Sequence, residues 1–145
     1  MTALTTENTW VPSAPFRAHL RLLLDGTGLP WPVMALAAGV PLRLVARLLN
    51  TPGSRRLPKL PAESAHRLLH LDLRTLTELG QREVPAQQTA RILASLLADG
   101  CPPARLASYC RLSRSELVAT LTAPTCSRLT ALLARSARMQ YRPAR

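Results

Sequence analysis

The sequence predicts an all-α fold, made of two small helical bundles joined by a short linker. Three observations support this. Hydrophobic residues make up 47% of the 145 residues but aromatic residues only 3%, so the cores must be built from Leu, Ala and Val. Segments rich in Leu and Ala, with few β-branched runs, favour helices over strands. The chain also resembles itself when it is shifted by 72 residues, which divides it into two related halves.

The first half begins with an arm and a helix. Residues 1–13 are polar and rich in Thr, and we expect a flexible arm whose Trp10 docks on the body. In residues 15–25 apolar side chains recur at helical spacing, with the arginines outside. This pattern predicts a first helix, ended by two glycines that follow it closely.

The next stretch, PWPVMALAAGVPLRLVARLLN, covers residues 30–50 and carries no charge before Arg43. Its prolines and glycines interrupt it, so a membrane-spanning helix, which needs roughly 20 apolar residues, is not expected. The stretch divides at Gly39 into predicted helices at 31–38 and 41–50. Gly39 is suited to a positive φ angle in the turn between them. The pattern is a helix-turn-helix, in which the second helix can lie in a DNA major groove.

Four residues of this stretch have a fixed spacing: Ala35, Gly39, Val45 and Leu48. The spacing resembles the helix-turn-helix of bacterial and phage repressors. In that family a small residue is followed four positions later by glycine, and branched apolar residues follow six and nine positions after the glycine. The resemblance implies DNA binding by a small module, here residues 14–80, whose closing helix packs across the motif.

The remainder of the first module is a loop and two helices. The segment TPGSRRLPKLP predicts a basic loop built from turn residues. Pro61 then opens a helix with Leu68 and Leu69 as its apolar side. Asp72 is the expected N-cap of a short helix that reaches Gly80.

The second module covers residues 81–138, after a linker at 81–85, and a basic tail follows at 139–145. The shift of 72 residues rests on matches that include Leu20 with Ile92, Leu24 with Leu96, Gly28 with Gly100, Ala35 with Ala107 and Val45 with Leu117. Its helix-turn-helix has predicted helices at 105–110 and 113–121. After the second of these, a short Ala-Pro-Thr segment is expected to pass almost directly into a final helix.

The second motif departs from the repressor pattern at two positions. Arg111 replaces the turn glycine, so it must take another turn conformation or bear strain. Thr120 stands where a core aliphatic residue is expected. Ser113 and Glu116 form an S-x-x-E capping box, which makes Glu116 a cap rather than a base reader.

The net charge indicates the class of partner. The formal charge is +11 at pH 7 and the pI is about 11.5, so the chain is attracted to polyanions at long range. Double-stranded DNA is the expected partner, and an anionic membrane or an acidic protein is the alternative. Arg supplies 18 of the 19 cationic side chains, which suits planar recognition of phosphate and guanine, although a GC-rich genome produces the same bias.

The candidate DNA-binding residues fall into two groups. Arg43 and Arg47 are four residues apart on one helix face, where each can donate two hydrogen bonds to guanine, or can contact phosphates only. Asn50 can pair with adenine or cap its helix, and Leu42 suits a thymine methyl. The base-reading candidates are Leu42, Arg43, Arg47, Asn50, Arg114 and Ser115. The candidates for phosphate or minor-groove contact are Arg55, Arg56, Lys59, Arg111, Arg138 and Arg142.

No catalytic, cofactor or metal site is expected. Cys101, Cys110 and Cys126 have spacings that fit no usual metal motif, and we expect buried free thiols in a reducing cytosol. There is no nucleophile elbow, no phosphate-binding glycine loop and no recognised metal-type histidine motif. The sequence therefore favours a binding protein over an enzyme.

The functional hypothesis is a DNA-binding transcription regulator of bacteria or phages that reads the major groove with tandem helix-turn-helix modules. One alternative is a nucleoid-associated or accessory protein that binds DNA with little sequence preference. Another is an all-helical adaptor for a protein partner such as a sigma factor or polymerase subunit. We expect a cytoplasmic protein at the nucleoid, without membrane association. Two-fold pairing into a homodimer is common in this class and is left open.

Overall fold

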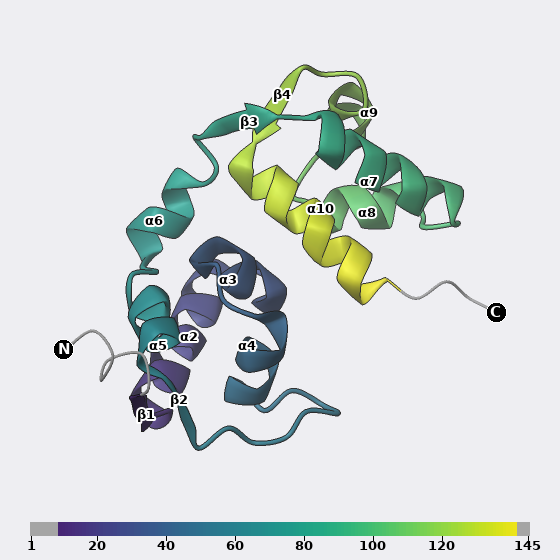
Figure 1. Cartoon of the computed structure of the whole chain (residues 1–145). Coiled ribbons are helices and arrows are strands. Elements are labelled where there is room, and N and C mark those ends of the chain that lie inside the picture. Colours follow the sequence, from purple (N-terminus) through teal and green to yellow (C-terminus); the bar gives the residue numbers. More distant parts are fainter. Residues whose placement is uncertain (1–8, 142–145) are drawn as a thin grey trace. The chain divides into compact units, whose positions relative to one another are not determined.

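The computed structural model describes residues 9–141, most of which are helical, together with two short two-stranded antiparallel sheets (Figure 1). The chain divides into two compact units, residues 1–76 and 77–145. This division lies inside α6 (Leu73–Glu78), whereas the sequence analysis placed it after residue 80. It falls earlier because the segment after α6 is tied to the second unit, where the carbonyl oxygen of Leu79 accepts a hydrogen bond from the backbone N–H of Leu129 at 3.0 Å.

The first unit contains two strands and four complete helices within its described part. Its elements in chain order are β1 (Trp10–Pro12), α2 (Ala14–Thr27), α3 (Trp31–Ala38), α4 (Leu42–Leu48), β2 (Lys59–Pro61) and α5 (Ala62–Leu69), and α6 begins before its end. α3 has the predicted bounds. Asp72 precedes α6, and its Oδ1 accepts a hydrogen bond from the backbone N–H of Thr75 at 2.7 Å, which confirms the predicted cap.

The strands correct the prediction of an all-α fold and of a flexible arm. β1 pairs with β2 in antiparallel register, with Val11 opposite Leu60, so the end of the predicted arm is part of the unit. Leu60 is completely buried, and this burial positions the pair. Residues 1–8 of the predicted arm lie outside the described residues. Strands of three residues that each contain a proline have no alternating pattern that sequence reasoning can detect.

The core of the first unit is built from aliphatic side chains of its helices and of β2. Its completely buried large side chains are Leu20, Val33, Met34, Leu48, Leu60 and Leu68. Leu69, which was expected to share the apolar side of α5, is 59% exposed. The buried face of α5 is formed by Ala65 and Leu68, because residues three apart share a helix face and adjacent residues do not.

The second unit has the same order of elements after α6. They are β3 (Glu83–Pro85), α7 (Gln87–Ala98), α8 (Pro103–Tyr109), α9 (Arg114–Thr120), β4 (Thr125–Ser127) and α10 (Arg128–Gln140). β3 pairs with β4 in antiparallel register, and α10 packs along α7 (Figure 1). The predicted linker at 81–85 and the segment before the final helix thus contain strand residues rather than simple connections.

Backbone hydrogen bonds show that the two units repeat each other closely, and they also correct the alignment. The N–H of Ser13 bonds to Pro58 in the first unit, and the N–H of Ala86 bonds to Pro124 in the second. Ser13 and Ala86 are 73 residues apart, not 72. Over the first helix this register pairs Leu20 with Leu93, both completely buried, instead of pairing Leu20 with Ile92. α4 and α9 keep the shift of 72 residues.

Within residues 9–141, no helix is both long enough and apolar enough to cross a membrane.

Candidate nucleic-acid interface

The turn between α3 and α4 is closed by Gly39. Its φ angle is 72°, which confirms the predicted left-handed conformation, and its N–H donates to the carbonyl oxygen of Ala35 at 2.9 Å. The carbonyl oxygen of Gly39 accepts a hydrogen bond from Nη1 of Arg67 on α5, also at 2.9 Å. Glu63 forms an ion pair with the same guanidinium, at 2.9 Å. α5 therefore supports the turn from outside.

α4 is fixed on its inner side and at its end. Val45 and Leu48 are completely buried. Nε of Arg17, on α2, donates to the carbonyl oxygen of Leu48 at 2.6 Å, and its Nη2 donates to that of Leu57 at 3.1 Å. The sequence analysis placed the arginines of this first helix outside, but Arg17 is half-buried. It satisfies a carbonyl group at the end of α4, where a cation is favoured.

The outer side of α4 carries the first group of predicted site residues. The helix covers residues 42–48, so it is shorter than predicted at both ends. Arg43 is exposed and Leu42 is half-buried. Asn50 follows the helix with a φ angle of 55°, a conformation that Asn tolerates better than most residues. It is exposed, so the helix-end position and an outward amide occur together.

Arg47 lies on the same helix but faces the loop that follows. Its Nε donates to the carbonyl oxygen of Arg55 at 3.3 Å, and its Nη2 is 3.5 Å from that of Arg56. Both distances are at the long end for N–H···O bonds, so these contacts are weak. Arg47 is half-buried while Arg43 is exposed, which makes the two arginines unequal although they share a face.

The basic loop is anchored at both ends. At its start, the hydroxyls of Thr51 and Ser54 donate to the carbonyl oxygen of Ala46, at 3.2 and 3.1 Å. At its end, Leu57 is buried. Lys59, which the sequence analysis assigned to the loop, belongs to β2. The predicted contact residues Arg55, Arg56 and Lys59 are all exposed on this anchored segment.

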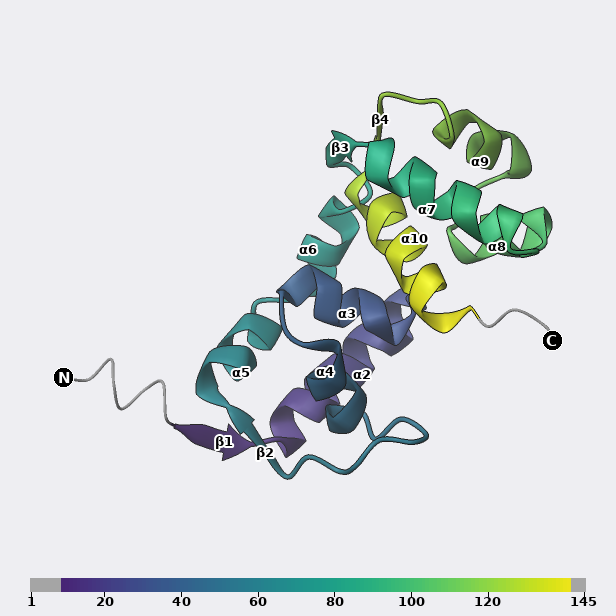
Figure 2. The same cartoon turned by 45° about the vertical axis from the view of Figure 1, so that its right-hand side comes forward.

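Arginines from α4 and the loop line a shallow hollow of about 370 Å³, on the side of the unit where the loop follows α4 (Figure 2). Its lining residues are Arg43, Ala46, Arg47, Gly53, Ser54 and Arg55. None of them is acidic. Between residues 26 and 62 the chain has five cationic side chains and no Asp or Glu. We call these five the α4 cation cluster: Arg43, Arg47, Arg55, Arg56 and Lys59.

Trp10 lies beside this cluster, and sequence reasoning missed it as a site residue. It lines a second hollow of about 190 Å³ together with Pro41, Arg43, Leu44 and Arg47, among others. Its side chain is 57% exposed. The backbone pairing of Trp10 with Pro61 in the sheet places it there. No local sequence signal connects a Trp near the N-terminus with a helix about thirty residues later.

The corresponding turn of the second unit follows the prediction made for it. Arg111 has a φ angle of 59°, so it adopts the left-handed conformation of the glycine that it replaces. Ser113 and Glu116 form both hydrogen bonds of the capping box at the start of α9. Thr120 is buried, and its hydroxyl donates to the carbonyl oxygen of Glu116 at 2.7 Å, which explains how a polar residue fits an apolar position.

The outer side of α9 has a different chemistry from that of α4. Ser115 and Ala119 occupy the positions of Arg43 and Arg47. Val118, between them, is 65% exposed. Arg111 and Arg114 are exposed near the start of the helix, but the hollow that Arg111 lines also contains Glu83 and Glu116. The predicted residues of the second unit therefore do not form an acid-free cluster.

Two further predicted residues lie at the end of the chain. Arg138 is exposed in the last turn of α10, so it belongs to a helix rather than to a tail. Arg142 lies outside the described residues.

The cysteines are free and buried, as predicted. Burial, with a smaller contribution from Cys101, raises the pKa of the Cys110 thiol to about 12. A thiol with this pKa is not a nucleophile at neutral pH.

Comparison of the chain with protein-family models, curated protein sequences and solved structures gave no match. The function must therefore be argued from the chemistry of the α4 cation cluster.

Proposed function

We propose that the chain is a double-stranded DNA-binding protein of the helix-turn-helix type, in which α3 and α4 form the motif and α4 enters the major groove. The observation that carries the proposal is the α4 cation cluster, five cationic side chains without an acidic residue between positions 26 and 62. An acid-free cluster on a supported helix attracts phosphates and allows an Arg to approach a base edge.

The particular role that we propose is transcription regulation in a bacterium or phage. A regulator must read sequence, and reading needs a side chain held in a fixed position. Arg43 is the main candidate, because it is exposed on a helix whose other side is buried. Arg47, Arg55, Arg56 and Lys59 then position the protein on phosphates, and Arg47 also retains its contacts with the loop. Asn50 and Leu42 are the remaining base-reading candidates of this unit.

The second unit supports this proposal differently. Arg111 and Arg114 can contact phosphates and Ser115 a base, but the exposed Val118 favours contact with a protein. This residue is the observation in favour of the second candidate function, an adaptor that binds a protein of the transcription machinery. A second copy of the chain is an equally suitable partner for a regulator, since a homodimer doubles the number of base contacts.

The deciding experiment is selection from a random-sequence DNA pool, followed by binding measurements on the selected DNA at several salt concentrations. We expect an enriched motif. Arg43→Ala should weaken binding to it by about 5- to 150-fold and relax the preference at particular bases. Arg91→Ala is the matched control, because it removes the same charge from an exposed position of α7 and should change the preference at no base.

The other outcomes separate the alternatives. Binding with a steep salt dependence but without an enriched motif would identify a nonspecific nucleoid-type protein, because counterion release would then supply the affinity. If the protein fails to bind DNA even at low salt, DNA binding is wrong and the adaptor function remains.

A further inference from the structure

Two histidines of α5 lie in direct contact, away from the α4 cation cluster. His66 and His70 are four residues apart, so they occupy the same face of the helix. Their Nε2 atoms are 3.0 Å apart, and their ring planes are perpendicular with centroids 4.4 Å apart. Both side chains are exposed. As neutral rings they can share one hydrogen, which one Nε2 donates and the other accepts.

The same arrangement suits a metal ion. A transition-metal ion binds imidazole nitrogen at about 2.1 Å, so two nitrogens at a right or tetrahedral angle are about 2.9 to 3.4 Å apart. The distance of 3.0 Å falls in this range. Two His residues at positions i and i+4 of a helix are also the spacing by which helical metal sites present two ligands from one face. We propose that His66 and His70 bind a divalent ion of the borderline class, Ni²⁺, Cu²⁺ or Zn²⁺, through their Nε2 atoms.

The site has two protein ligands. Among residues 9–141, no group of three or more His, Cys, Asp or Glu side chains could hold a metal ion together. Glu63 is on the same helix, but its Oε1 forms an ion pair with Arg67. The remaining coordination positions are therefore open to water or to an external ligand. Because imidazole ligands follow the general order of divalent affinities, Cu²⁺ should bind more tightly than Ni²⁺ or Zn²⁺.

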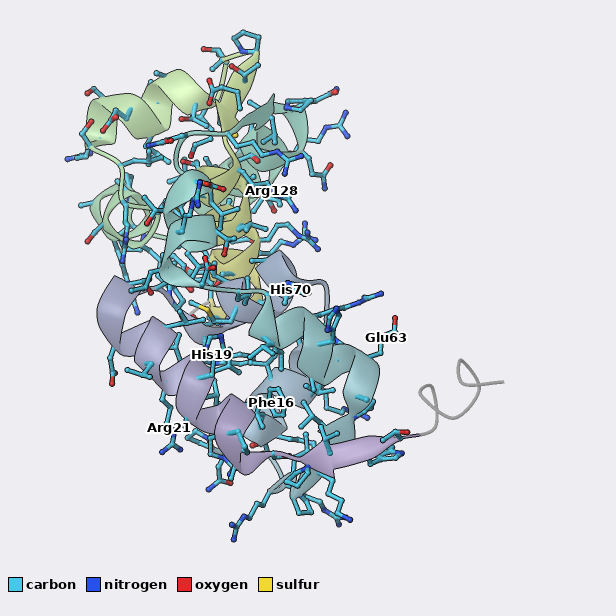
Figure 3. The ribbon with its side chains drawn as sticks, turned by 90° about the vertical axis from the view of Figure 1, so that its left-hand side faces the viewer. Phe16, His19, Arg21, Glu63, His70 and Arg128 are labelled. Carbon is cyan, nitrogen blue, oxygen red and sulfur yellow. The ribbon has the colours of Figure 1, made fainter. Side chains whose placement is uncertain are left out.

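The sequence analysis expected no metal site, because it compared the histidines with the cysteines and with established motifs. The spacing of His66 and His70 was visible in the sequence, but the rotamers that bring the two rings together were not. His19 is the third histidine, and its Nε2 lies 2.7 Å from the carbonyl oxygen of Leu71. Figure 3 labels His70 on α5 and His19 on the neighbouring α2.

A bound ion would link consecutive turns of α5 and stabilise the folded unit, because the unfolded chain does not hold the two rings together. α5 also supports the turn before α4 through Arg67 and Gly39. Metal binding is nevertheless a property of the histidine pair alone. It does not depend on DNA binding, so the failure of one proposal leaves the other intact.

The test uses the full chain without an affinity tag. Retention on immobilised Ni²⁺ and calorimetric titration with Ni²⁺ alone are measured for the original protein and for His66→Ala, His70→Ala and His19→Asn. We expect one Ni²⁺ per chain, reversal by EDTA, and at least a tenfold loss of affinity in His66→Ala and in His70→Ala. His19→Asn should bind as the original protein does. Circular dichroism checks that each variant is folded.

Two results would overturn the proposal. One is the absence of Ni²⁺ binding by the original protein. The other is unchanged binding by His66→Ala and His70→Ala, which would place the ion elsewhere. If either Ala variant unfolds, His70→Gln replaces it, since Gln keeps a polar side chain of similar size on the helix and should also lose the ion.

Discussion

Gly39 and Arg111 adopt the same left-handed backbone conformation at equivalent turns of the two units, with φ angles of 72° and 59°. The residue after each donates its N–H to an equivalent alanine, Val40 to Ala35 at 3.1 Å and Leu112 to Ala107 at 2.9 Å. The two turns therefore have one geometry, although only one of them carries the residue that adopts it without strain. For a residue with a side chain this conformation costs about 1–2 kcal/mol.

This strain predicts opposite effects of exchanging the residues. Arg111→Gly should raise the free energy of unfolding by about 1 kcal/mol, because glycine relieves the strain but adds freedom to the unfolded chain. Gly39→Ala should lower it by a similar amount. A Cβ at Gly39 would lie 3.8 Å from the nearest atom, Nη1 of Arg67, so its cost comes from the φ angle and not from crowding.

Urea unfolding followed by circular dichroism measures both changes. Arg111→Ala is the control, because it removes the same side chain and keeps the strained conformation. The explanation by strain is wrong if Arg111→Gly is no more stable than Arg111→Ala.

Trp10 provides an optical test of the proposed interface. It is 57% exposed and shares a hollow with Arg43 and Arg47, so DNA on α4 should cover it. In a Trp31→Phe background, where Trp10 is the remaining Trp, we expect DNA to quench or shift the fluorescence in parallel with binding. Trp10→Ala should weaken binding by about 1–3 kcal/mol if the ring stacks on or packs against the nucleic acid. DNA binding without any change in the fluorescence of Trp10 would place the interface elsewhere.

The helices could be predicted from sequence because their signals are local. Apolar spacing gave the helical segments, and Pro and Gly gave several of their ends, so the predicted bounds of α3 agree with the structure. The capping box of Ser113 and Glu116 is equally local. The register error over the first helix had a different cause. Leu is so frequent there that Leu20 finds an apolar partner at a shift of either 72 or 73 residues.

The parts of the candidate site that were missed depend on contacts between distant segments. Arg17 is 31 residues from Leu48, whose carbonyl oxygen it binds, and an Arg on an amphipathic helix is normally assigned to solvent. Trp10 reaches the hollow beside α4 only because β1 pairs with β2. Both contacts are set by the tertiary fold, so sequence spacing contains no signal for them. Whether the cation cluster binds DNA stays a prediction.

Glu116 predicts a pH dependence of stability. Hydrogen bonds from the backbone N–H and then the hydroxyl of Ser113 lower the pKa of this carboxyl group below its ordinary value of 4.5. Since the folded pKa is lower than the unfolded one, the ionised group stabilises the fold above about pH 4.5. That stabilisation is lost as the pH falls through the folded pKa. We therefore expect Glu116 to add to the fall in melting temperature between pH 5 and pH 3.

Glu116→Gln separates this effect from capping, because Gln can still accept the hydrogen bond but does not titrate in this range. The melting temperature of this variant should depend less on pH below 4.5 than that of the original protein. Asp72 also has a lowered pKa, caused mainly by the backbone N–H of Thr75, so some dependence should remain. Identical curves for the two proteins would show that the capping carboxylate does not contribute.

Ser13 provides the last prediction, because the second unit serves as its natural comparison. Its Oγ is buried and has no hydrogen-bond partner among the described residues, and Ala86 occupies the equivalent position. A buried hydroxyl without a partner costs about 1–3 kcal/mol relative to one that is hydrogen-bonded. Ser13→Ala should therefore leave the free energy of unfolding unchanged or raise it by up to about 1 kcal/mol. Ser127→Ala is the contrasting variant, since the Oγ of Ser127 caps α10 by accepting the N–H of Thr130 at 3.0 Å. Its loss should cost about 1 kcal/mol. Urea unfolding of both variants decides the point, and a clear destabilisation by Ser13→Ala would mean that this hydroxyl is hydrogen-bonded in solution.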